Sequence, residues 1–143
     1  MKRCLADVNV LIALLARNHE HHKLARKWFD GLAAGEAGLC RMVQLALIRL
    51  LGNSLVMGQY AMAADAAWRL TGELLEDERL DFMAEPRELE SVFPTMLGYP
   101  VPTNKLVGDA YVAAFSIAAR CRLATFDRGF RQFKGVELDL LHR

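Results

Sequence analysis

Several compositional features that often reveal a protein's class are missing from this sequence of 143 residues. It holds only three cysteines, Cys4, Cys40 and Cys121, an odd number without a closely spaced pair, so neither a disulfide framework nor a zinc site is expected. Positive and negative side chains nearly balance, with 18 Lys and Arg against 17 Asp and Glu, so the strong positive charge of many nucleic-acid binders is absent. The partner therefore has to be inferred from particular residues rather than from net charge.

Long apolar runs are missing as well. Lys2 and Arg3 are followed by apolar residues, but Asp7 and Asn9 interrupt them and leave only residues 10–16 as a continuous apolar stretch. That length is about the minimum for a secretory signal, which we therefore do not expect. No stretch approaches the roughly 20 apolar residues of a membrane-spanning helix. These absences, together with cysteines that are expected to be reduced, predict a cytoplasmic protein that does not associate with membranes.

What the sequence does contain is the composition of a chain with a substantial core. Hydrophobic residues make up 53% and charged residues 24%, and the length fits one ordinary domain, so we predict a single domain over residues 1–143. Short apolar segments alternate with longer segments of helical periodicity. This alternation predicts crossover connections and an α/β fold, a three-layer α/β/α sandwich with a mainly parallel sheet of about five strands.

The expected elements follow from this periodicity and from the positions of glycine and proline. Gly35 is expected to end the second helix, and the prolines of residues 94–102 predict a loop there. Strands are expected at 3–6, 37–40, 80–83, 122–125 and 136–140, and helices at 10–17, 22–34, 42–51, 62–75, 85–92 and 105–120.

Two acidic residues follow predicted strands. Asp7 ends the first strand and Asp127 follows the fourth, and open α/β sheets bind ligands at the carboxyl ends of their strands. Asp109 lies beside the apolar stripe of helix 105–120, ahead of the fourth strand. Converging carboxylates repel each other, and protonation or a hard divalent cation such as Mg²⁺ or Mn²⁺ relieves that repulsion. Each acid also has an ordinary structural interpretation: Asp7 as a helix N-cap, Asp109 as a partner of the helix dipole and Asp127 as the start of a turn.

Four segments of the chain together resemble the PIN-domain family, in particular its VapC toxin group. They read L-x-D-x-N-V-L-I from Leu5, C-x-x-x-Q-L-x-L-x-R-L-L from Cys40, D-A-x-x-A-A-x-x-I-A from Asp109 and L-A-T-F-D-R-G-F from Leu123. Their order and spacing agree with that group across essentially the whole chain, although residues 54–100 add little.

The resemblance implies an endoribonuclease that hydrolyses RNA phosphodiester bonds with bound Mg²⁺ or Mn²⁺. Carried over by position, Asp7, Asp109 and Asp127 match the catalytic metal ligands, and Asn9 and Thr125 match polar residues that support them. It further implies a homodimer and a cognate antitoxin protein whose C-terminal segment crosses the active site.

The chain departs from the family on helix 42–51, where a second acid, usually Glu, is expected and no carboxylate occurs. Gln44 could support the site as a neutral ligand or hydrogen-bond donor, and Arg49 could contact phosphate, but the sequence favours a solvated Gln and an ordinary surface Arg. Fewer negative ligands should weaken metal affinity. The alternative function is therefore a PIN-like RNA- or protein-binding module with weak or no catalytic activity.

Other residues allow two interpretations each. Basic residues and phenylalanines around Asp127, Arg128 among them, could hold RNA by phosphate contact and stacking, or could form a solvated rim over core aromatics. Clustered histidines are interpreted as solvated rather than as metal ligands. Met57, Met62 and Trp68 could be core, or could line a groove or dimer surface. The basic residues are Arg120, Arg122, Arg128, Arg131 and Lys134, the phenylalanines are Phe126, Phe130 and Phe133, and the histidines are His19, His21 and His22.

Two unrelated α/β classes fit less well. A haloacid-dehalogenase-like phosphatase would need a second Asp at the position of Asn9, and a receiver domain would need an acid pair ahead of its phospho-acceptor strand and a late Lys, which we do not find.

Overall fold

The computed structural model describes residues 2–98 and 105–142. Within these residues five strands form one sheet in the order β3-β2-β1-β4-β5, and every neighbouring pair is parallel. The predicted parallel sheet of about five strands is therefore confirmed. The strands are β1 (Cys4–Ala6), β2 (Ala37–Leu39), β3 (Leu80–Phe82), β4 (Arg122–Thr125) and β5 (Leu138–Leu140).

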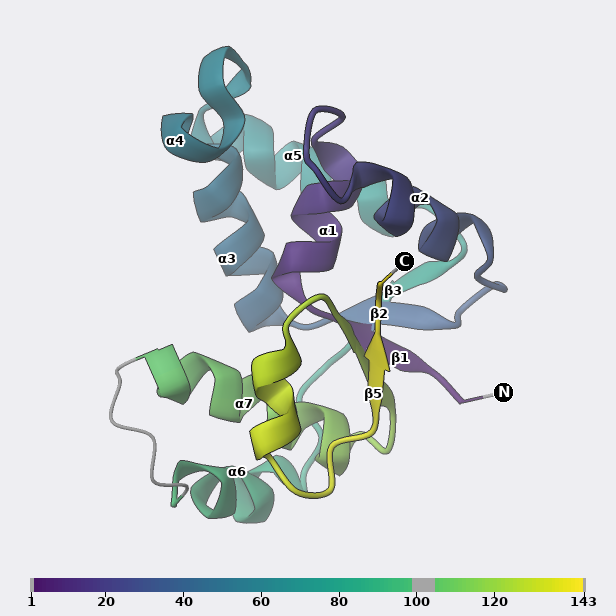
Figure 1. Ribbon diagram of the computed structural model, residues 1–143, viewed down its shortest axis with the longest axis vertical. Helices are drawn as coiled ribbons and strands as arrows, with labels where there is room; N and C mark the ends of the chain where they lie inside the picture. The colour runs from purple at the N-terminus through teal and green to yellow at the C-terminus, as the bar shows by residue number, and fades with distance from the viewer. Residues whose placement is uncertain (1, 99–104, 143) are drawn as a thin grey trace.

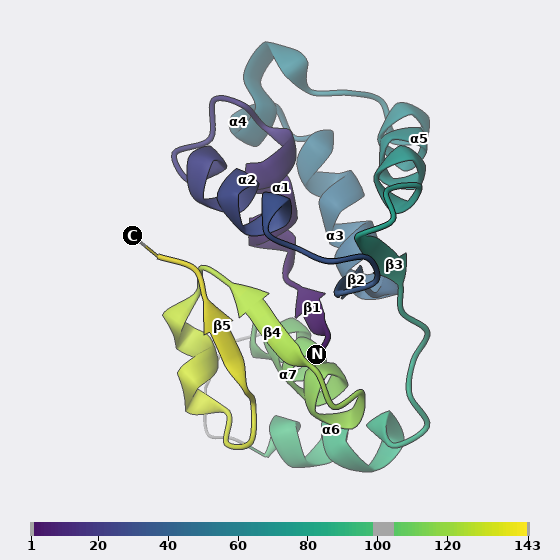
Figure 2. The ribbon, with the colours of Figure 1, turned by 90° about the vertical axis from the view of Figure 1, so that its right-hand side faces the viewer.

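Helices lie on both sides of the sheet, so the three layers are those expected from the alternating pattern (Figures 1 and 2). The helices on one side of the sheet belong to the chain between β1 and β3, and those on the other side belong to the chain between β3 and β4. On one side lie α1 (Val8–Leu15), α2 (His22–Asp30), α3 (Arg41–Leu51), α4 (Ser54–Met57), a 3₁₀ turn (Gly58–Tyr60) and α5 (Ala64–Leu75); on the other lie α6 (Leu89–Leu97) and α7 (Lys105–Ala118). A second 3₁₀ helix, Arg128–Gln132, connects β4 to β5.

The core is built where these layers meet. All three residues of β1 are fully buried, because helices cover both of its faces. The three cysteines are also buried, and burial raises the pKa of Cys4 to about 12 and raises those of Cys40 and Cys121. Gly38 in β2 allows a close approach, since a Cβ atom there would lie 2.5 Å from the side chain of Met83. Gly38 thus leaves room for the side chain of Met83, which follows the neighbouring strand β3.

The strand order reverses between β1 and β4. The chain adds β2 and β3 on one side of β1, then returns to add β4 and β5 on the other side. In open parallel sheets, ligands bind outside the carboxyl ends of the strands at such a reversal. The ends of β1 and β4 are therefore the place to look for a functional site.

Most helix boundaries differ from the predicted ones by one or two residues, and the largest differences are at α2 and α6, which begins at Leu89 rather than at 85. α6 spans Leu89–Leu97 and contains Pro94, so the prediction of a loop from residue 94 is wrong as far as 97, and the remainder of it, from 99 to 102, lies outside the described residues. A proline inside a helix costs roughly 3 kcal/mol, but burial of Leu89 and Met96 and the edge-on contact of Phe93 with Tyr111 on α7 offset that cost. α2 ends at Asp30 rather than at Gly35.

Three smaller features complete the comparison with the expected elements. The helix at Ser54–Met57 and the 3₁₀ turn after it were not expected. Three residues were predicted to be either core or part of a groove or dimer surface. Met57 is buried, Met62 is partly buried against the core and the side chain of Trp68 is half exposed. In the part of the chain that the structure describes, no helix has the length and apolar character needed to cross a membrane.

Candidate active site

Asp7 is the first residue after β1 and faces β4. Its carboxylate Oδ1 accepts a hydrogen bond from the Val8 backbone N–H at 2.8 Å and so caps α1, as one of its two interpretations expected. The other oxygen, Oδ2, accepts a hydrogen bond from the Thr125 hydroxyl at 2.7 Å. Only 7% of Asp7 is exposed, which makes it a buried carboxylate at the strand reversal.

The environment of Asp7 disfavours its charged form. Burial raises the pKa of the Asp7 carboxyl, and the negative charge of Asp127 raises it further. The hydrogen bonds from the Thr125 hydroxyl and the Val8 N–H act in the opposite direction. A cation beside Asp7 and Asp127 would stabilise both carboxylates in their charged forms.

Thr125, the last residue of β4, connects the parts of the site. Its fully buried hydroxyl donates to Asp7 and accepts hydrogen bonds from the Asp127 backbone N–H at 3.0 Å and from Asn9 Nδ2 at 3.2 Å. Asn9 Oδ1 in turn accepts from the Phe126 backbone N–H at 3.2 Å. The polar residues Asn9 and Thr125 therefore join the start of α1 to the segment after β4.

Asp127 lies on the open side of this network. Its side chain is exposed, and Oδ1 accepts a hydrogen bond from the Gly129 N–H at 2.7 Å, so Asp127 also begins the 3₁₀ helix that follows. Arg128 is exposed directly beside it. The structure thus brings Asp7, Asn9, Thr125 and Asp127 to one point at the carboxyl edge of the sheet.

Asp109 approaches from a different element. It is half-buried in the second turn of α7, the helix that leads back into β4. Among residues 2–98 and 105–142, no three His, Cys, Asp or Glu side chains are gathered into a metal-binding group. The structure therefore brings Asp7 and Asp127 together, while Asp109 does not join them in a ready-made group of three.

The two residues singled out on α3 lie outside the hydrogen-bond network of Thr125. Gln44 is 3% exposed rather than solvated; its Nε2 donates to the Thr71 hydroxyl, and its Oε1 accepts from Arg41. Arg49 is exposed in the last turn of α3, about 12 Å along the helix axis from Arg41, given a rise of about 1.5 Å per residue.

The basic and aromatic residues near Asp127 in sequence separate in space. Phe130 and Phe133 are core residues with 2% exposure, so for this pair the core interpretation is correct. Arg122 begins β4 and therefore lies at the opposite end of that strand from Asp127. Phe126 is half-buried and stacks on His21, with ring centroids 4.6 Å apart.

The histidines near the start of α2 take part in local packing. His22 Nδ1 lies 2.8 Å from the Ala13 carbonyl, and His19 Nδ1 accepts a hydrogen bond from the His21 backbone N–H. Burial lowers the pKa of His19. The three histidines are therefore partly buried in local packing, so the interpretation of a solvated cluster is wrong in this respect.

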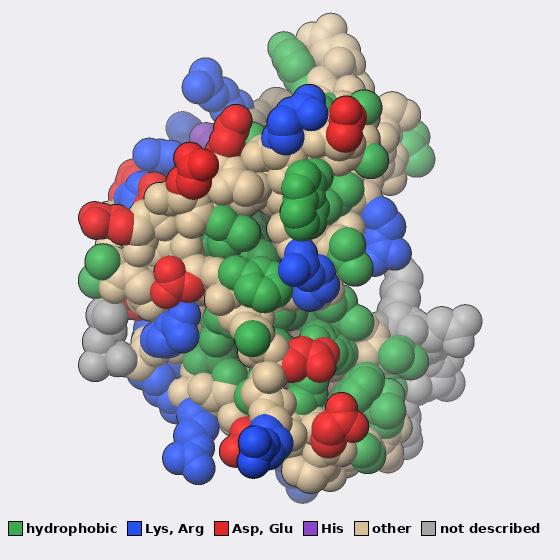
Figure 3. Space-filling view, turned by 180° about the vertical axis from the view of Figure 1, so that it is seen from behind, with side chains coloured by type: hydrophobic (Ala, Val, Ile, Leu, Met, Phe, Trp, Pro, Cys, Tyr) green, Lys and Arg blue, Asp and Glu red, His purple; other side chains and the backbone are tan. Residues whose placement is uncertain are grey.

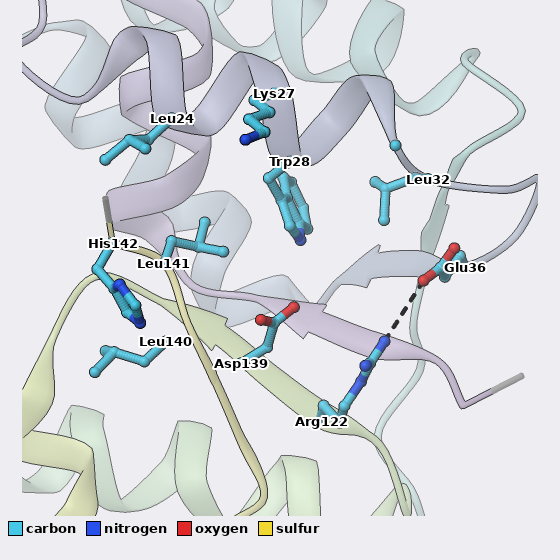
Figure 4. A pocket seen from close by; sticks show the side chains of 11 residues that line it. Leu24, Lys27, Trp28, Leu32, Glu36, Arg122, Asp139, Leu140, Leu141 and His142 are labelled. Carbon is cyan, nitrogen blue, oxygen red and sulfur yellow. Dashed lines mark hydrogen bonds and ion pairs between the residues drawn. The ribbon is translucent and has the colours of Figure 1, made fainter.

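A hollow of about 540 Å³ lies elsewhere, between α2 and the strands β4 and β5 (Figure 4). Trp28 points into it from α2 and Asp139 from β5, while Glu36 and Arg122 form an ion pair of 3.5 Å at one side. None of the four residues that converge at the end of β1 lines this hollow. It is a separate feature from the candidate site.

The donor atoms at the candidate site fit a hard divalent cation. They are carboxylate, hydroxyl and amide oxygens, the ligands that Mg²⁺ and Mn²⁺ prefer, and Mg²⁺ commonly binds through one or two carboxylates while keeping several waters. The thiol of Cys40, which follows β2, is disfavoured as a ligand, because burial and, to a smaller extent, the charge of Asp7 raise its pKa.

Comparisons with known proteins identify the family of the chain. A family model described as the PIN domain matches residues 4–136. The chain is 37% identical over 142 residues to ribonuclease VapC41 of Mycobacterium tuberculosis, covering 96% of this chain and 97% of that protein. It is 26% identical to ribonuclease VapC37 of the same organism, covering 94% of each chain.

Solved structures show the same fold at low identity. M. tuberculosis VapC20, described as a sarcin-ricin loop cleaving toxin, superposes with a TM-score of 0.66 at 16% identity, covering 94% of this chain and 97% of that chain. VapBC2 of Rickettsia felis, bound to a promoter DNA fragment, gives a TM-score of 0.69 at 10% identity, covering 97% and 98%.

Proposed function

The chain belongs to the PIN-domain family, and from that premise we propose that it is a metal-dependent endoribonuclease, the toxin of a toxin–antitoxin pair. The relatives that it matches over nearly their whole length are named ribonucleases. The observation that carries the proposal is the buried carboxylate of Asp7 at the strand reversal, beside Asp127. A buried carboxylate with a raised pKa in that position is expected at a functional site rather than at a purely structural cap.

We propose that Asp7, Asp109 and Asp127 are the catalytic acids and would hold Mg²⁺ or Mn²⁺. The cation would neutralise charge at the scissile phosphate and lower the pKa of water that attacks it. Thr125 would keep Asp7 oriented through its 2.7 Å hydrogen bond, and Asn9 would hold the segment after β4 in place. Asp109 would join them from the second turn of α7, the helix that leads into β4.

Substrate contacts would come from arginine. Arg128 is exposed beside Asp127, where it would contact an RNA phosphate next to the cleaved bond. Arg49 would reach RNA only at a distance from the acids, because it lies at the far end of α3. Gln44 would support the site indirectly, through Arg41, since both ends of its amide are already hydrogen-bonded.

The partners follow from the same family. Solved structures of the same fold include VapBC complexes from Rickettsia felis and from Haemophilus influenzae, which contain a toxin and its antitoxin. We propose that this chain likewise binds a cognate antitoxin protein and forms a homodimer.

The second candidate function is a PIN-like module that binds RNA or protein without cutting. The composition of α3 favours it, because Gln44 carries no charge and no carboxylate occurs on that helix. A site with fewer negative ligands would bind the cation more weakly.

Cleavage of a mixed RNA pool by the antitoxin-free protein, with Mn²⁺ or Mg²⁺ and with EDTA as the blank, tests the proposal. Asp7→Asn should abolish cutting, whereas Asp65→Asn, which changes an exposed acid of α5, should leave it unchanged. Cutting that survives Asp7→Asn would place the active site elsewhere. A folded protein that binds RNA but cuts in neither metal would support the binding module.

A further inference from the structure

Two exposed aromatic side chains on different elements share one guanidinium beside the carboxyl edge of the sheet. Trp68 on α5 is 51% exposed, and Phe82, the last residue of β3, is 42% exposed. Arg41 begins α3 between them, with its Cζ atom 5.8 Å from the Trp68 ring centroid and 4.6 Å from that of Phe82. We call these three side chains the Arg41 platform. Seen from behind, hydrophobic side chains lie next to Lys or Arg side chains on this face (Figure 3).

Hydrogen bonds through two buried side chains, Gln44 and Thr71, hold the platform in place. Gln44 Oε1 accepts from Arg41 Nη1, Gln44 Nε2 donates to the Thr71 hydroxyl at 3.2 Å, and that hydroxyl donates to the Trp68 carbonyl at 2.7 Å. Gln44 and Thr71 are 3% and 0% exposed. The network therefore fixes an exposed guanidinium from inside the protein and ties it to the helix that carries Trp68, which leaves less conformational entropy to be lost on binding.

The platform lies near the candidate active site. Phe82 pairs with Leu39 in the sheet, and β2 is the strand between β3 and β1. Neighbouring strands are about 4.8 Å apart, so the end of β3 is roughly 10 Å from the end of β1, where Asp7 follows. Arg41 follows Leu39 by two residues, so its backbone lies at the carboxyl end of β2, the strand between β3 and β1. A single RNA strand crossing Asp7 would reach the platform within a few nucleotides.

The chemistry of the platform matches an unpaired nucleobase. Bases of single-stranded RNA stack on aromatic rings and on arginine planes, and both surfaces are offered together here. In the part of the chain that the structure describes, Arg41 forms no ion pair, so its charge is available to the phosphate of the same nucleotide. A purely apolar partner would instead leave that guanidinium buried without a counter-charge.

We propose that the Arg41 platform is a base-stacking subsite that holds one unpaired base of the RNA near the cleavage point. This inference rests on the proposed ribonuclease function, and it adds a second contact that would select flexible single-stranded targets over paired ones.

Trp68 reports directly on its own occupancy once the other tryptophan is removed. In Trp28→Phe protein, the fluorescence of Trp68 should be quenched by a 2′-O-methyl RNA hexamer, which resists cleavage, and not by an abasic chain of equal length and charge. Since base–aromatic stacking contributes about 1–3 kcal/mol per base, the abasic chain should bind roughly 5- to 150-fold more weakly. Phe82→Leu should weaken hexamer binding within the same range, whereas Tyr60→Leu, at another exposed aromatic residue, should not.

The outcomes separate the subsite from the nuclease. If Trp28→Phe protein cuts RNA with Mn²⁺ while Trp68 is not quenched, or is quenched equally by the abasic chain, the subsite is refuted and the nuclease stands. Quenching that requires bases, in a protein that cuts nothing, upholds the subsite and refutes the nuclease. Weaker hexamer binding in Phe82→Leu that coincides with dissociation of a dimer in sedimentation velocity, without base-dependent quenching, would identify the platform as a surface between protomers and overturn the proposal.

Discussion

Replacing Thr125 by valine would remove one hydroxyl from the centre of the candidate site while nearly preserving the size of the side chain. The hydroxyl donates to Asp7 and accepts from the Asp127 N–H and from Asn9. Because the residue is fully buried, valine would leave the facing oxygen of Asp7 without its donor.

The loss of stability on removing the Thr125 hydroxyl depends on which of its hydrogen-bond partners can bind water instead. Asp127 is exposed and Asn9 is partly exposed, so water can replace the bonds that they lose. Asp7 is 7% exposed, and a hydrogen bond to a charged group contributes about 1.5–3 kcal/mol. We expect Thr125→Val to lower the free energy of unfolding by about 2 kcal/mol, which corresponds to a Tm about 4–8 °C lower for a chain of this length.

Thr125→Ser is the matched control, because it keeps the hydroxyl and removes only a buried methyl group, a change of about 0.8 kcal/mol. Urea unfolding of both variants and of the parent, in EDTA at pH 7, measures the difference. The hydroxyl stabilises the charged form of Asp7, so its contribution is present above the folded-state pKa of Asp7 and is lost as the pH falls through that value. The gap between the valine and serine variants should therefore narrow in acid.

Equal stability of the two variants at pH 7 would show that the hydroxyl does not support Asp7. A gap that stays constant down to acidic pH would show that the hydroxyl acts on the neutral groups and not on the carboxylate. Either result would refute the electrostatic account of the site.

Three further changes test the site and its frame. Asp7→Asn should raise the free energy of unfolding of the metal-free protein at neutral pH by about 0.5–2 kcal/mol, because burial penalises the charge. The gain should vanish as the pH falls below the unfolded-state pKa of Asp, about 3.9, and urea titrations at pH 7 and at about pH 3 check it. Pro94→Ala should raise the melting temperature in calorimetry, since it restores a helical N–H within α6, and an unchanged value would mean that the packing of α6 depends on the ring. Gly38→Ala should lower the free energy of unfolding by about 1–3 kcal/mol, because the new Cβ would lie 2.5 Å from Met83. Gly72→Ala should raise it by about 0.5–1 kcal/mol, because a Cβ there meets nothing within 4 Å outside its own helix. Changes of the same sign in urea unfolding would contradict the packing.

The parts of the fold that sequence predicted well are those set by local pattern. Short apolar runs give the five parallel strands, and an acid directly after such a run is placed at the carboxyl edge by topology alone. This is why Asp7 and Asp127 could be expected to meet. The structure shows Asp7 as the N-cap of α1, and its role as a metal ligand stays a prediction. The two roles do not exclude each other, because each carboxylate oxygen accepts one hydrogen bond here and keeps a second lone pair.

Features that depend on distant residues could not be read from local pattern. Gln44 looked solvated because its buried partner, Thr71, lies 27 residues further on, and the exposed platform at Arg41 follows from that contact. Pro94 predicted a loop, since the packing of α6 on α7 has no local signal. The basic residues close to Asp127 in sequence separate because a strand of four residues, β4, carries Arg122 to its opposite end.

The link between Asp7 and Thr125 spans 118 residues of chain, which has a consequence for the synthesis of the protein. A growing polypeptide emerges from its N-terminus, so α1, α2 and the first half of the sheet can assemble while β4 is still inside the ribosome. Asp7 then lacks its hydroxyl donor and its acidic neighbour, and no complete site exists. The site of a protein that cuts RNA is thereby incomplete until β4 has left the ribosome and paired with β1.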